Sequence, residues 1–436
     1  MSIIIGHYHL HPGGVTRIID SQIRSLKQNF PDTEIKVITG HTEDTTKYKK
    51  FGIPVLTENN LNYLSTKNLD SDTLSHKLSE IEDFLKSTVK RNDILHFHNI
   101  NLGKNPLLTF AIYHLAQKGY NVFNHAHDFA EDRPSNMEFN QFIIENHLET
   151  NTNEVLYPKN MPNYGYGVIN SFDRERLLQF NLGPERIAYL PNPVIIPPEA
   201  LKLKKSECRK TILRKLHLDE KTNIITYPVR VIRRKNIGEF ILLSELFGPD
   251  YTFLVTLAPK NPIEIKPYLE WKNFCKSHQI SQVHFEVGKE INFHELVKGS
   301  DFSITTSYRE GFGMAFMEPW LYDTPVVGRD IPEVTRDFMQ NGVTFHNLYT
   351  QLKIPGKEKD FIELSMEEQM HFIAELKNDN SLRKQLETEN QKVKKIFTPR
   401  PTEEIDNNKE AIVKNYSFEN YGKKIMDTYR TFFGKP

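Results

Sequence analysis

The sequence has few cysteines, no excess of charge and no long apolar segment. Cys208 and Cys275 are its 2 cysteines, and two cysteines cannot form a disulfide framework. Lysine plus arginine equal aspartate plus glutamate at 56 each, so the basic excess of a general nucleic-acid binder is missing. No segment approaches the roughly 20 apolar residues of a membrane helix, and the first residues lack a basic leader and a cleavage site. These absences predict a soluble cytoplasmic protein that binds no nucleic acid.

One segment, residues 201–218, is locally rich in lysine and arginine. A basic run of this kind is usually the solvated face of a helix. Contact with a membrane surface is the less frequent alternative. We therefore expect an exposed helix here, with membrane contact as the minor alternative.

Short apolar runs alternate with longer amphipathic stretches along most of the chain. The runs that predict strands are Ile3–Ile5, Ile35–Thr39, Ile94–His98, Asn121–Asn124, Gly167–Asn170, Ile187–Leu190, Ile224–Tyr227, Tyr251–Leu257, Val283–Glu286, Phe302–Thr306 and Pro325–Val327. The stretches that predict helices are Arg17–Phe30, Leu74–Lys90, Leu107–Lys118, Ile237–Phe247, Ile263–His278, Glu290–Gly299 and the aromatic-rich Phe418–Phe433. This alternation is typical of α/β proteins, whose parallel sheets are covered by helices on both faces.

A proline-rich segment, Leu190–Pro198, interrupts the alternation. Its prolines, at positions 191, 193, 197 and 198, stop helices and strands alike. A chain of 436 residues is also too long for one compact core. We therefore predict two Rossmann-like halves joined by this linker. Residues 129–162 fit no clean period, and we expect a long loop with a helix there.

Histidines gather at the ends of three predicted strands, at positions 7, 9, 11, 96, 98, 125 and 127. Converging imidazoles can bind a metal. Strand alternation also places these residues on shared faces, where they would form the polar wall of a ligand crevice. Asp128 is the only acid in these runs, and no H-E-x-x-H or C-x-x-C spacing occurs. We therefore predict that the cluster holds no metal.

Two strand-to-helix turns carry residues that suit a phosphorylated ligand. Gly13 and Gly14 follow the first strand, where bare backbone can approach a phosphate or a sugar, although such glycines often serve turn geometry alone. Arg230 and Lys235 lie five residues apart after the strand that ends at Tyr227, and they could clamp a diphosphate. The alternative is a solvated basic turn, because two further arginines lie between them.

The segment 310–318, EGFGMAFME, separates two carboxylates by exposed backbone. Glu310 follows a predicted buried strand, and we expect a helix to start near Gly313 or Met314, whose N-terminus would favour an anion. Ionised carboxylates only accept hydrogen bonds, so Glu310 and Glu318 suit a ligand with hydroxyls at two places. A nucleotide sugar fits this pattern; two unrelated surface acids are the alternative.

The motif E-G-F-G-x-x-x-x-E at 310–318, followed by T-P-V-V at 324–327, resembles the large family of retaining glycosyltransferases with the GT-B fold, which includes sucrose synthases and bacterial mannosyl- and glucosyltransferases. Supporting motifs are G-G-V-x-R at 13–17, H-D at 127–128, N-S at 170–171, P-N-P-V at 191–194 and R-x-x-x-x-K-N at 230–236. The resemblance implies two Rossmann-like domains that face a cleft. Residues 1–193 with the C-terminal helix 417–436 would form the acceptor-side domain, and residues 194–416 the nucleotide-sugar domain.

The resemblance also implies roles for the residues of the second domain. Glu310 would bind the hydroxyls of the donor sugar, together with backbone N–H groups of Gly311, Phe312 and Gly313. Arg230 and Lys235 would hold the diphosphate, and Glu318 the ribose. Met314 would lie at the anion-binding helix start, and Val287 near the base.

The implied reaction is the anomer-retaining transfer of a hexosyl group from a nucleotide-diphosphate sugar to an acceptor hydroxyl. Gly14 would approach the reacting centre, and His127 would lie beside the donor sugar. The acceptor could be a small molecule, a saccharide or a lipid-linked group. No metal and no cofactor beyond the donor substrate is implied, because fixed cations would meet the leaving-group charge.

Three departures from the family pattern occur. Val229 stands where the family often has glycine, Pro319 falls within the expected helix, and residues 129–162 match no family motif, although the family binds acceptors in this domain. A shared fold also leaves other functions open. The alternatives are a sugar-nucleotide epimerase or another enzyme on this fold, and a non-catalytic sugar-binding protein. The donor base stays open among UDP, GDP and ADP.

Overall fold

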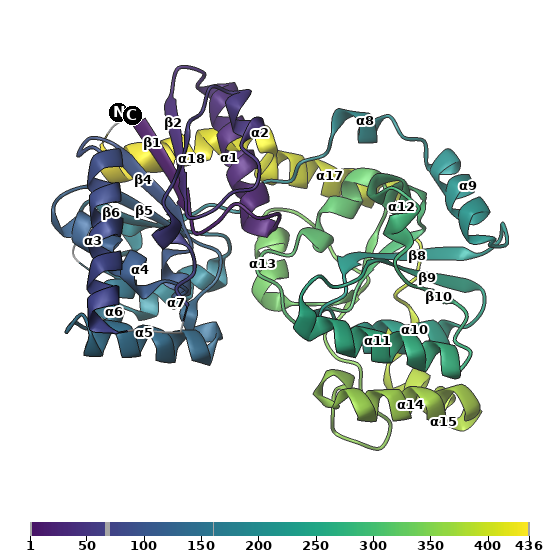
Figure 1. Ribbon diagram of the computed structural model, residues 1–436. Helices are drawn as coiled ribbons and strands as arrows, with labels where there is room; N and C mark the ends of the chain where they lie inside the picture. The colour runs from purple at the N-terminus through teal and green to yellow at the C-terminus, as the bar shows by residue number, and fades with distance from the viewer. Residues whose placement is uncertain (1, 66–69, 160, 435–436) are drawn as a thin grey trace. The chain divides into compact units, whose positions relative to one another are not determined.

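The computed structural model describes residues 2–65, 70–159 and 161–434, and the chain divides into two compact units (Figure 1). Unit 1 comprises residues 1–195 and 416–436, and unit 2 comprises residues 196–415. The first boundary lies inside the proline-rich segment, where the sequence analysis had placed it at 193/194. The chain therefore passes from one unit to the other twice.

Unit 1 is built on a seven-stranded parallel sheet with the strand order β3-β2-β1-β4-β5-β6-β7. Its strands are β1 Ser2–His7, β2 Glu34–Thr39, β3 Val55–Thr57, β4 Ile94–His98, β5 Asn121–Ala126, β6 Tyr164–Val168 and β7 Ile187–Tyr189. Its α-helices are α1 Gly14–Asn29, α2 Thr46–Lys49, α3 Ser71–Thr88, α4 Pro106–Gln117, α5 Pro134–Asn146, α6 Thr152–Leu156, α7 Ser171–Gln179 and α18 Phe418–Phe433. Short 3-10 helices are η1 Asn59–Leu61, η2 Ile100–Leu102, η3 Ala130–Asp132 and η4 Pro184–Arg186.

Strand alternation divides the core of unit 1 into two layers. Ile3 and Ile5 of β1 belong to one hydrophobic cluster, together with apolar residues of α1 and α18. Ile4 points to the other face and belongs to a second cluster, to which α3, α4, α5, α6 and α7 contribute. The sheet is therefore covered on both faces, as the apolar strand pattern predicts.

The C-terminal helix α18 packs beside α1 (Figure 1). Ser25 Oγ donates to the Phe418 carbonyl at 2.6 Å and accepts from the Gly422 N–H at 2.7 Å. A Cβ atom at Gly422 would lie 2.7 Å from the Ser25 backbone, so only glycine allows the two helices to approach this closely. The last helix of the chain is thus part of the core of unit 1.

Unit 2 is built on a six-stranded parallel sheet with the strand order β10-β9-β8-β11-β12-β13. Its strands are β8 Asn223–Arg230, β9 Tyr251–Leu257, β10 Val283–His284, β11 Phe302–Thr305, β12 Val326–Arg329 and β13 Leu348–Tyr349. Its α-helices are α8 Pro198–Leu201, α9 Lys205–Leu216, α10 Ile237–Phe247, α11 Pro262–Ser277, α12 Phe293–Gly299, α13 Pro332–Gln340, α14 Met366–Asn378, α15 Asn380–Glu389, α16 Gln391–Lys394 and α17 Thr402–Tyr416. Its 3-10 helices are η5 Arg233–Lys235, η6 Val287–Lys289, η7 Met314–Phe316, η8 Glu318–Tyr322 and η9 Phe361–Glu363.

A buried ion network ties the sheet of unit 2 to α10. The Arg329 guanidinium at the end of β12 donates to Glu239 and to Asp360, with Nη2 at 2.6 and 2.7 Å from their carboxylates. Tyr349 OH donates to Glu239 at 2.5 Å. Glu239 and Arg329 are 0% and 2% exposed, so each charge depends on its partner. The network holds the start of α10, which follows the turn that contains Lys235.

The α/β class with two parallel sheets is confirmed, and four elements match the prediction to the residue: β4, β9, α10 and α18. Two short strands, β3 and β13, were not predicted. Residues 129–162 were expected to form a long loop with a helix, and they contain two α-helices, α5 and α6, so the segment is more helical than predicted. Pro134 occupies the first turn of α5, where its missing N–H costs no helical hydrogen bond.

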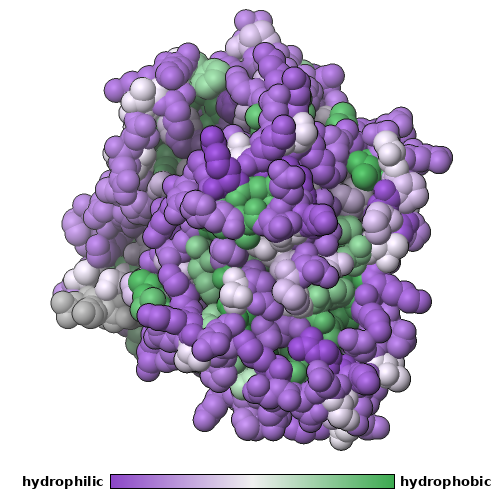
Figure 2. All heavy atoms as spheres, turned by 90° about the vertical axis from the view of Figure 1, so that its right-hand side faces the viewer, coloured by the Kyte–Doolittle hydropathy of each residue, from purple (hydrophilic) through white to green (hydrophobic). Residues whose placement is uncertain are grey.

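Hydrophilic side chains dominate the face of the molecule drawn in Figure 2, and the hydrophobic ones visible there form small separate areas. Among the described residues, no helix combines the length and the apolar character that spanning a membrane requires. The basic run 201–218 contains α9, where Cys208 and Ile212 are buried and most of the lysines and arginines are exposed or partly exposed.

Candidate functional site

In unit 2, Glu310 forms a cluster with two cations from the turn after β8. Its carboxylate accepts hydrogen bonds from Lys235 Nζ and Arg234 Nη1, and from Ser307 Oγ at 2.7 Å. The side chains of Glu310 and Lys235 are 7% and 12% exposed, and that of Arg234 is 39% exposed. One acid therefore faces two cations, and the cluster has a net positive charge.

These neighbours shift the pKa values of the cluster. Burial acts to raise the pKa of Glu310, but Lys235 and Arg234 outweigh it, so the pKa of this carboxyl lies below its ordinary value. Burial lowers the pKa of Lys235, and the attraction of Glu310 opposes this only in part. Glu310 is therefore ionised at neutral pH. It is poorly suited to act as a general base, because two cations stabilise its charged form.

Hydroxyl groups of the sheet hold the turn that carries Lys235. Tyr227 OH lies 3.0 Å from the Lys235 carbonyl and 2.7 Å from Ser307 Oγ. Thr306 Oγ1 donates to the same carbonyl at 3.0 Å. Asn236 then has a φ of 49°, in the left-handed region, and directs the chain into α10. The ammonium group of Lys235 is thus fixed by its backbone as well as by Glu310.

A helix does start at Met314, but the expectation of one helix that continues through Glu318 is wrong. The chain forms two short 3-10 helices instead, η7 and η8, separated by a single residue with φ of −118° and ψ of −48°. The reason is Pro319, which has no N–H to donate to the carbonyl four residues earlier, as an α-helix would require. Anion binding by the dipole of a long helix at this position is therefore ruled out.

The glycines and the aromatic residue of the motif have different surroundings. Gly311 is exposed, whereas Phe312 is buried, with its ring centroid 5.5 Å from that of Phe338 and the ring planes at 88°. Gly313 has a φ of 84°, and a Cβ atom there would lie 2.5 Å from Val334. Gly313 is therefore required by the fold itself, in addition to any ligand that it approaches.

The remaining predicted residues of unit 2 lie around the same end of the sheet. Arg230 ends β8, and its Nη1 donates to the Ala258 carbonyl at 2.5 Å. Glu318 begins η8 and is partly buried, and Val287 begins η6 and is buried. That Arg230 holds a diphosphate together with Lys235 stays a prediction. Arg234 also lies near Lys235, since both donate to Glu310.

In unit 1, the predicted glycines lie at the start of α1. Gly13 precedes the helix with a φ of −167°, an extended conformation that any residue adopts. Gly14 is exposed, and a Cβ atom at this position would meet no atom within 4 Å. The fold therefore does not need glycine at position 14, which leaves the backbone there accessible to a ligand.

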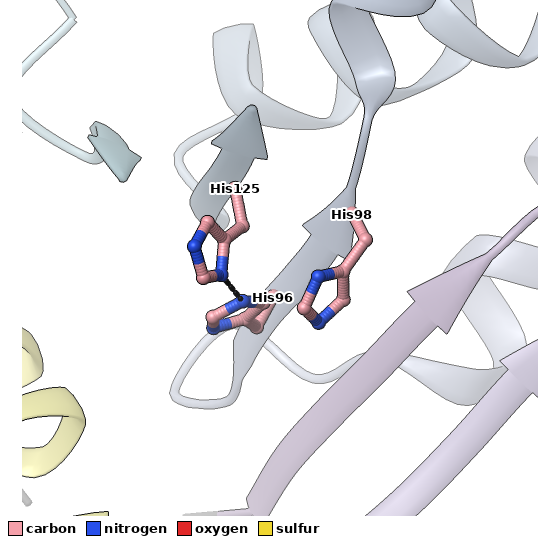
Figure 3. Close-up of side chains that lie close together, drawn as sticks. All are labelled: His96, His98 and His125. Atoms are coloured by element: carbon pink, nitrogen blue, oxygen red, sulfur yellow. Dashed lines mark hydrogen bonds between the residues drawn. The ribbon is translucent and has the colours of Figure 1, made fainter. Parts of the chain in front are cut away.

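Histidines of β1, β4 and β5 form a buried cluster in unit 1, and Figure 3 shows three of them, His96, His98 and His125. His96 Nε2 lies 3.2 Å from His125 Nδ1, and His98 Nδ1 lies 2.9 Å from His127 Nε2. The side chains of His96, His98 and His125 are 0% exposed, so the expectation that these three line a crevice wall is wrong. His127 keeps 9% of its surface exposed, and His7 lies 3.1 Å from the His98 carbonyl through its Nδ1.

Burial keeps these imidazoles neutral. It lowers the pKa of His127 to about 3 and that of His7 to about 4, and nearby histidines contribute further lowering. The pKa values of the other three lie well below 6.5 for the same main reason. The cluster is therefore uncharged over the physiological pH range.

Two groups of side chains in the described part of the chain have the spacing of metal ligands. The ring nitrogens of His96, His98 and His125 lie within 4.8 Å of one another, as do ligand atoms of His11, His41 and Glu43. The first group is buried and the second is exposed. That the protein needs no metal stays a prediction.

Residues 209–392 match the model of the family described as glycosyl transferases group 1. This stretch is a glycosyl transferases group 1 domain, and the fold of the chain is that of GT-B glycosyltransferases. Enzymes of this type use nucleotide sugars as donors, and the predicted family and fold class are thus confirmed.

One curated relative and two solved structures are similar to most of this chain. The mannosylglucosyl-3-phosphoglycerate synthase of Petrotoga mobilis is 29% identical over 398 residues, which cover 88% of this chain and 76% of the synthase. A glycosyltransferase from Rickettsia africae has the same fold, with a TM-score of 0.62 at 12% identity over 100% of this chain and 99% of its own. HepE of Anabaena in complex with UDP and glucose superimposes with a TM-score of 0.60 at 15% identity over 99% of this chain and 100% of its own.

Several side chains that support the two clusters were not predicted from the sequence. Arg234 entered only through the alternative of a solvated basic turn, and the side chains of Ser307 and Tyr227 were given no role. In unit 1, Gln22 of α1 and Tyr429 of α18 bond to the histidines. The signal for Gln22 was a polar residue on the apolar side of an amphipathic helix, whereas nothing local marks Tyr429.

Proposed function

We propose that this chain is an anomer-retaining glycosyltransferase that moves a hexosyl group from a nucleotide-diphosphate sugar to an acceptor hydroxyl, without a resident metal. The observation that carries the proposal is the cluster of Glu310 with Lys235 and Arg234 at the carboxyl ends of β8 and β11. In parallel sheets, ligands bind beyond this edge. A net positive, largely buried cluster there suits the anionic diphosphate of the donor.

The charge of the leaving group is the main demand of this reaction. As the bond between the anomeric carbon and the phosphate oxygen breaks, negative charge grows on that oxygen. Lys235 stabilises it from a fixed position, and Arg230 is the second predicted clamp. Cations that are already oriented can replace a divalent metal, because no reorganisation is needed when the charge develops.

The acceptor hydroxyl must lose a proton during transfer. Glu310 is not its acceptor in this proposal, since Lys235 and Arg234 keep its pKa low. The proton passes to an oxygen of the departing phosphate, while the acceptor oxygen bonds to the anomeric carbon on the face that the phosphate leaves. This geometry gives retention. Glu310 instead binds sugar hydroxyls, which can donate to its carboxylate.

The other predicted residues have binding roles. In unit 2, Glu318 accepts from the ribose hydroxyls, Val287 borders the base, and the backbone around Phe312 and Met314 supplies N–H groups. In unit 1, Gly14 gives the donor room beside the backbone, which agrees with the open space at its Cβ position. His127 contacts the donor sugar.

The acceptor class is suggested by the relative from Petrotoga mobilis, whose name denotes a product with a phosphoglycerate group. We extend the proposal to a water-soluble acceptor of this class, in preference to a lipid-linked one. Such an acceptor carries its own negative charges, so acceptors with and without the phosphate provide a direct comparison.

The proposal is tested first by thermal unfolding with UDP, GDP and ADP, because a ligand that binds only the native state raises its stability. One of the three should raise the unfolding temperature, with or without a chelator. The matching nucleotide sugar is then supplied with phosphoglycerate glucosides, and proton NMR follows the anomeric configuration of the product. An inverted product, or activity that vanishes with a chelator and returns with a metal, would refute the corresponding part.

A further inference from the structure

A continuous chain of hydrogen-bonded side chains runs through unit 1, with Gln22 of α1 at its centre. Gln22 Oε1 lies 2.8 Å from His98 Nε2, and His98 Nδ1 lies 2.9 Å from His127 Nε2. All three residues are at most 9% exposed. This arm leads from the buried side of α1 to His127, the histidine of the proposed donor site.

The direction of the hydrogen bonds along this arm follows from the amide of Gln22. Its Oε1 can only accept, so His98 Nε2 carries a proton and donates. A neutral imidazole has one N–H, and His98 Nδ1 is therefore an acceptor. His127 Nε2 must then be the donor in the 2.9 Å contact. It follows that the lone pair of the His127 ring lies on Nδ1.

A second arm leads from the same amide to His96. Gln22 Nε2 lies 3.1 Å from His96 Nδ1 and 3.4 Å from Tyr429 OH, and that hydroxyl lies 2.6 Å from His96 Nδ1. Both neighbours donate toward His96 Nδ1, so His96 carries its proton on Nε2 and donates to His125 Nδ1 at 3.2 Å. Tyr429 thereby accepts from the NH₂ group of Gln22 and keeps the amide in this orientation.

The arm through His98 needs a hydrogen-bond acceptor from Gln22, and the arm through His96 needs a donor. The orientation of the Gln22 amide therefore decides the direction of every hydrogen bond in both arms. If Gln22 were rotated so that its oxygen and nitrogen exchanged places, every hydrogen bond would have to reverse, and His127 would carry its proton on Nδ1. The imidazoles cannot avoid this choice by becoming charged, because burial disfavours the imidazolium form. The orientation of one amide thus sets the tautomer of His127.

We propose that Gln22, held by Tyr429, is a positioning residue that fixes His127 as the Nε2–H tautomer and presents His127 Nδ1 as a hydrogen-bond acceptor to a hydroxyl of the donor sugar. The lone pair of His127 Nδ1 is available to a ligand, because Nδ1 makes no hydrogen bond to any residue that the structure describes. His127 is also the most exposed of the four linked histidines. The inference rests on the proposed function for the identity of the ligand.

A metal is the competing interpretation of this cluster. Against it, the His98 ring stacks on His125 and on His127, with centroids 5.0 and 5.2 Å apart and planes at 29° and 17°. Stacked rings direct their nitrogens side by side instead of toward a common point. Both nitrogens of His96 and of His98 also have hydrogen-bond partners at 2.6–3.2 Å.

The tautomers can be measured directly by long-range ¹H–¹⁵N NMR on the full chain with ¹⁵N-labelled histidine. We expect His96, His98 and His127 as neutral Nε2–H forms, with no change between about pH 8 and pH 6. An Nδ1–H form of His127 would overturn the inference. So would bound zinc that changes the ¹⁵N chemical shifts of these rings. This measurement does not depend on the activity.

Two tyrosines of α18 provide a matched pair of variants. Tyr429→Phe removes only the hydroxyl that holds Gln22, whereas Tyr421→Phe removes a hydroxyl that is buried and makes no hydrogen bond among the described residues. Tyr429→Phe should give mixed tautomers at His127 and Tyr421→Phe should not. Gln22→Met, which keeps the side-chain length and removes both arms, should show the largest effect.

The functional consequence is a change in kcat. We expect kcat of Gln22→Met to fall about tenfold, as for the loss of one oriented hydrogen bond in the transition state, with little change in KM for the donor. Stabilisation by the free nucleoside diphosphate should remain, because that ligand lacks the sugar. Equal kcat for Gln22→Met and Tyr421→Phe would refute the inference. A wild-type protein that transfers no sugar would instead refute the proposed function and leave the NMR result valid.

Discussion

Acid should unfold unit 1 at a pH where most globular proteins are stable, because five histidines are buried there without charge. The pKa values of His7 and His127 lie at about 4 and about 3, and those of His96, His98 and His125 lie well below 6.5, burial being the main cause in each. In the unfolded chain a histidine titrates near 6.5. Between these values the unfolded chain binds more protons than the folded one, so the free energy of unfolding falls as the pH falls.

The magnitude follows from the number of neutral histidines. Each one reduces the free energy of unfolding by about 1.4 kcal/mol per pH unit below about pH 6.5, or about 2 kcal/mol between pH 7 and pH 5. For five histidines the loss is comparable to the whole stability of a typical domain, about 5–15 kcal/mol. We therefore expect unit 1 to unfold cooperatively near pH 5.

Urea unfolding followed by circular dichroism at several pH values between about 7 and 5 measures this loss, and the proton uptake on acid unfolding counts the groups. His125→Gln should lower the pH dependence by one histidine, whereas His76→Asn, at an exposed position, should leave it unchanged. A stability that is the same at both ends of this range would show that the buried cluster is charged or bound to a metal in the folded state, and the reasoning would fail.

Three further results are expected at the proposed donor site. Lys235→Ala should lower kcat by about 10²–10³, since one preorganised contact to the growing charge is lost, while Arg233→Ala, in the same turn but exposed, should keep near-normal rates. Calorimetry with free nucleoside diphosphate should separate the two acids: Glu310→Gln leaves that binding nearly intact and reduces turnover, whereas Glu318→Gln weakens it by about 1–3 kcal/mol, and equal losses would place both acids in one subsite. Gly14→Ala should unfold at the wild-type temperature because its Cβ meets no atom, yet lose activity; unchanged kinetics would remove Gly14 from the site.

The sequence predicted the fold well where apolar runs were long and uninterrupted. The strands β4 and β9 and the helix α10 are almost wholly buried, so their composition is dictated by the core and is easy to recognise. The short strands β3 and β13 have three and two residues, too few for a period to appear. In residues 129–162 polar and apolar positions alternate without a clear period because Asn136 and Asn140, both buried, bond to the backbone of neighbouring turns.

The site was predictable in its residue types and less so in its pairings. Glu310 and Lys235 were identified from spacing, and they do meet. The ion pair of Arg234 with Glu310, formed through a 3-10 turn, was not predicted, and the clamp of Arg230 and Lys235 on a diphosphate stays a prediction. Hydrogen bonds from the hydroxyls of Tyr227 and Thr306 to the Lys235 carbonyl hold this turn, and no local sequence pattern indicates them.

The return of the chain to unit 1 at its very end has a consequence for biosynthesis. Val194 donates to the Tyr416 carbonyl at 2.8 Å, so the outgoing and returning strands of the crossing are joined there. Between them lie residues 196–415, which make up unit 2 and which a ribosome producing about 5–20 residues per second needs on the order of 10–40 s to translate. During that interval the apolar face of α1 that α18 later covers stays open. Unit 2 can thus be complete before unit 1. A nascent chain that stalls before Phe418 is translated would expose the apolar face of α1, which favours aggregation, on a unit 1 that is otherwise folded.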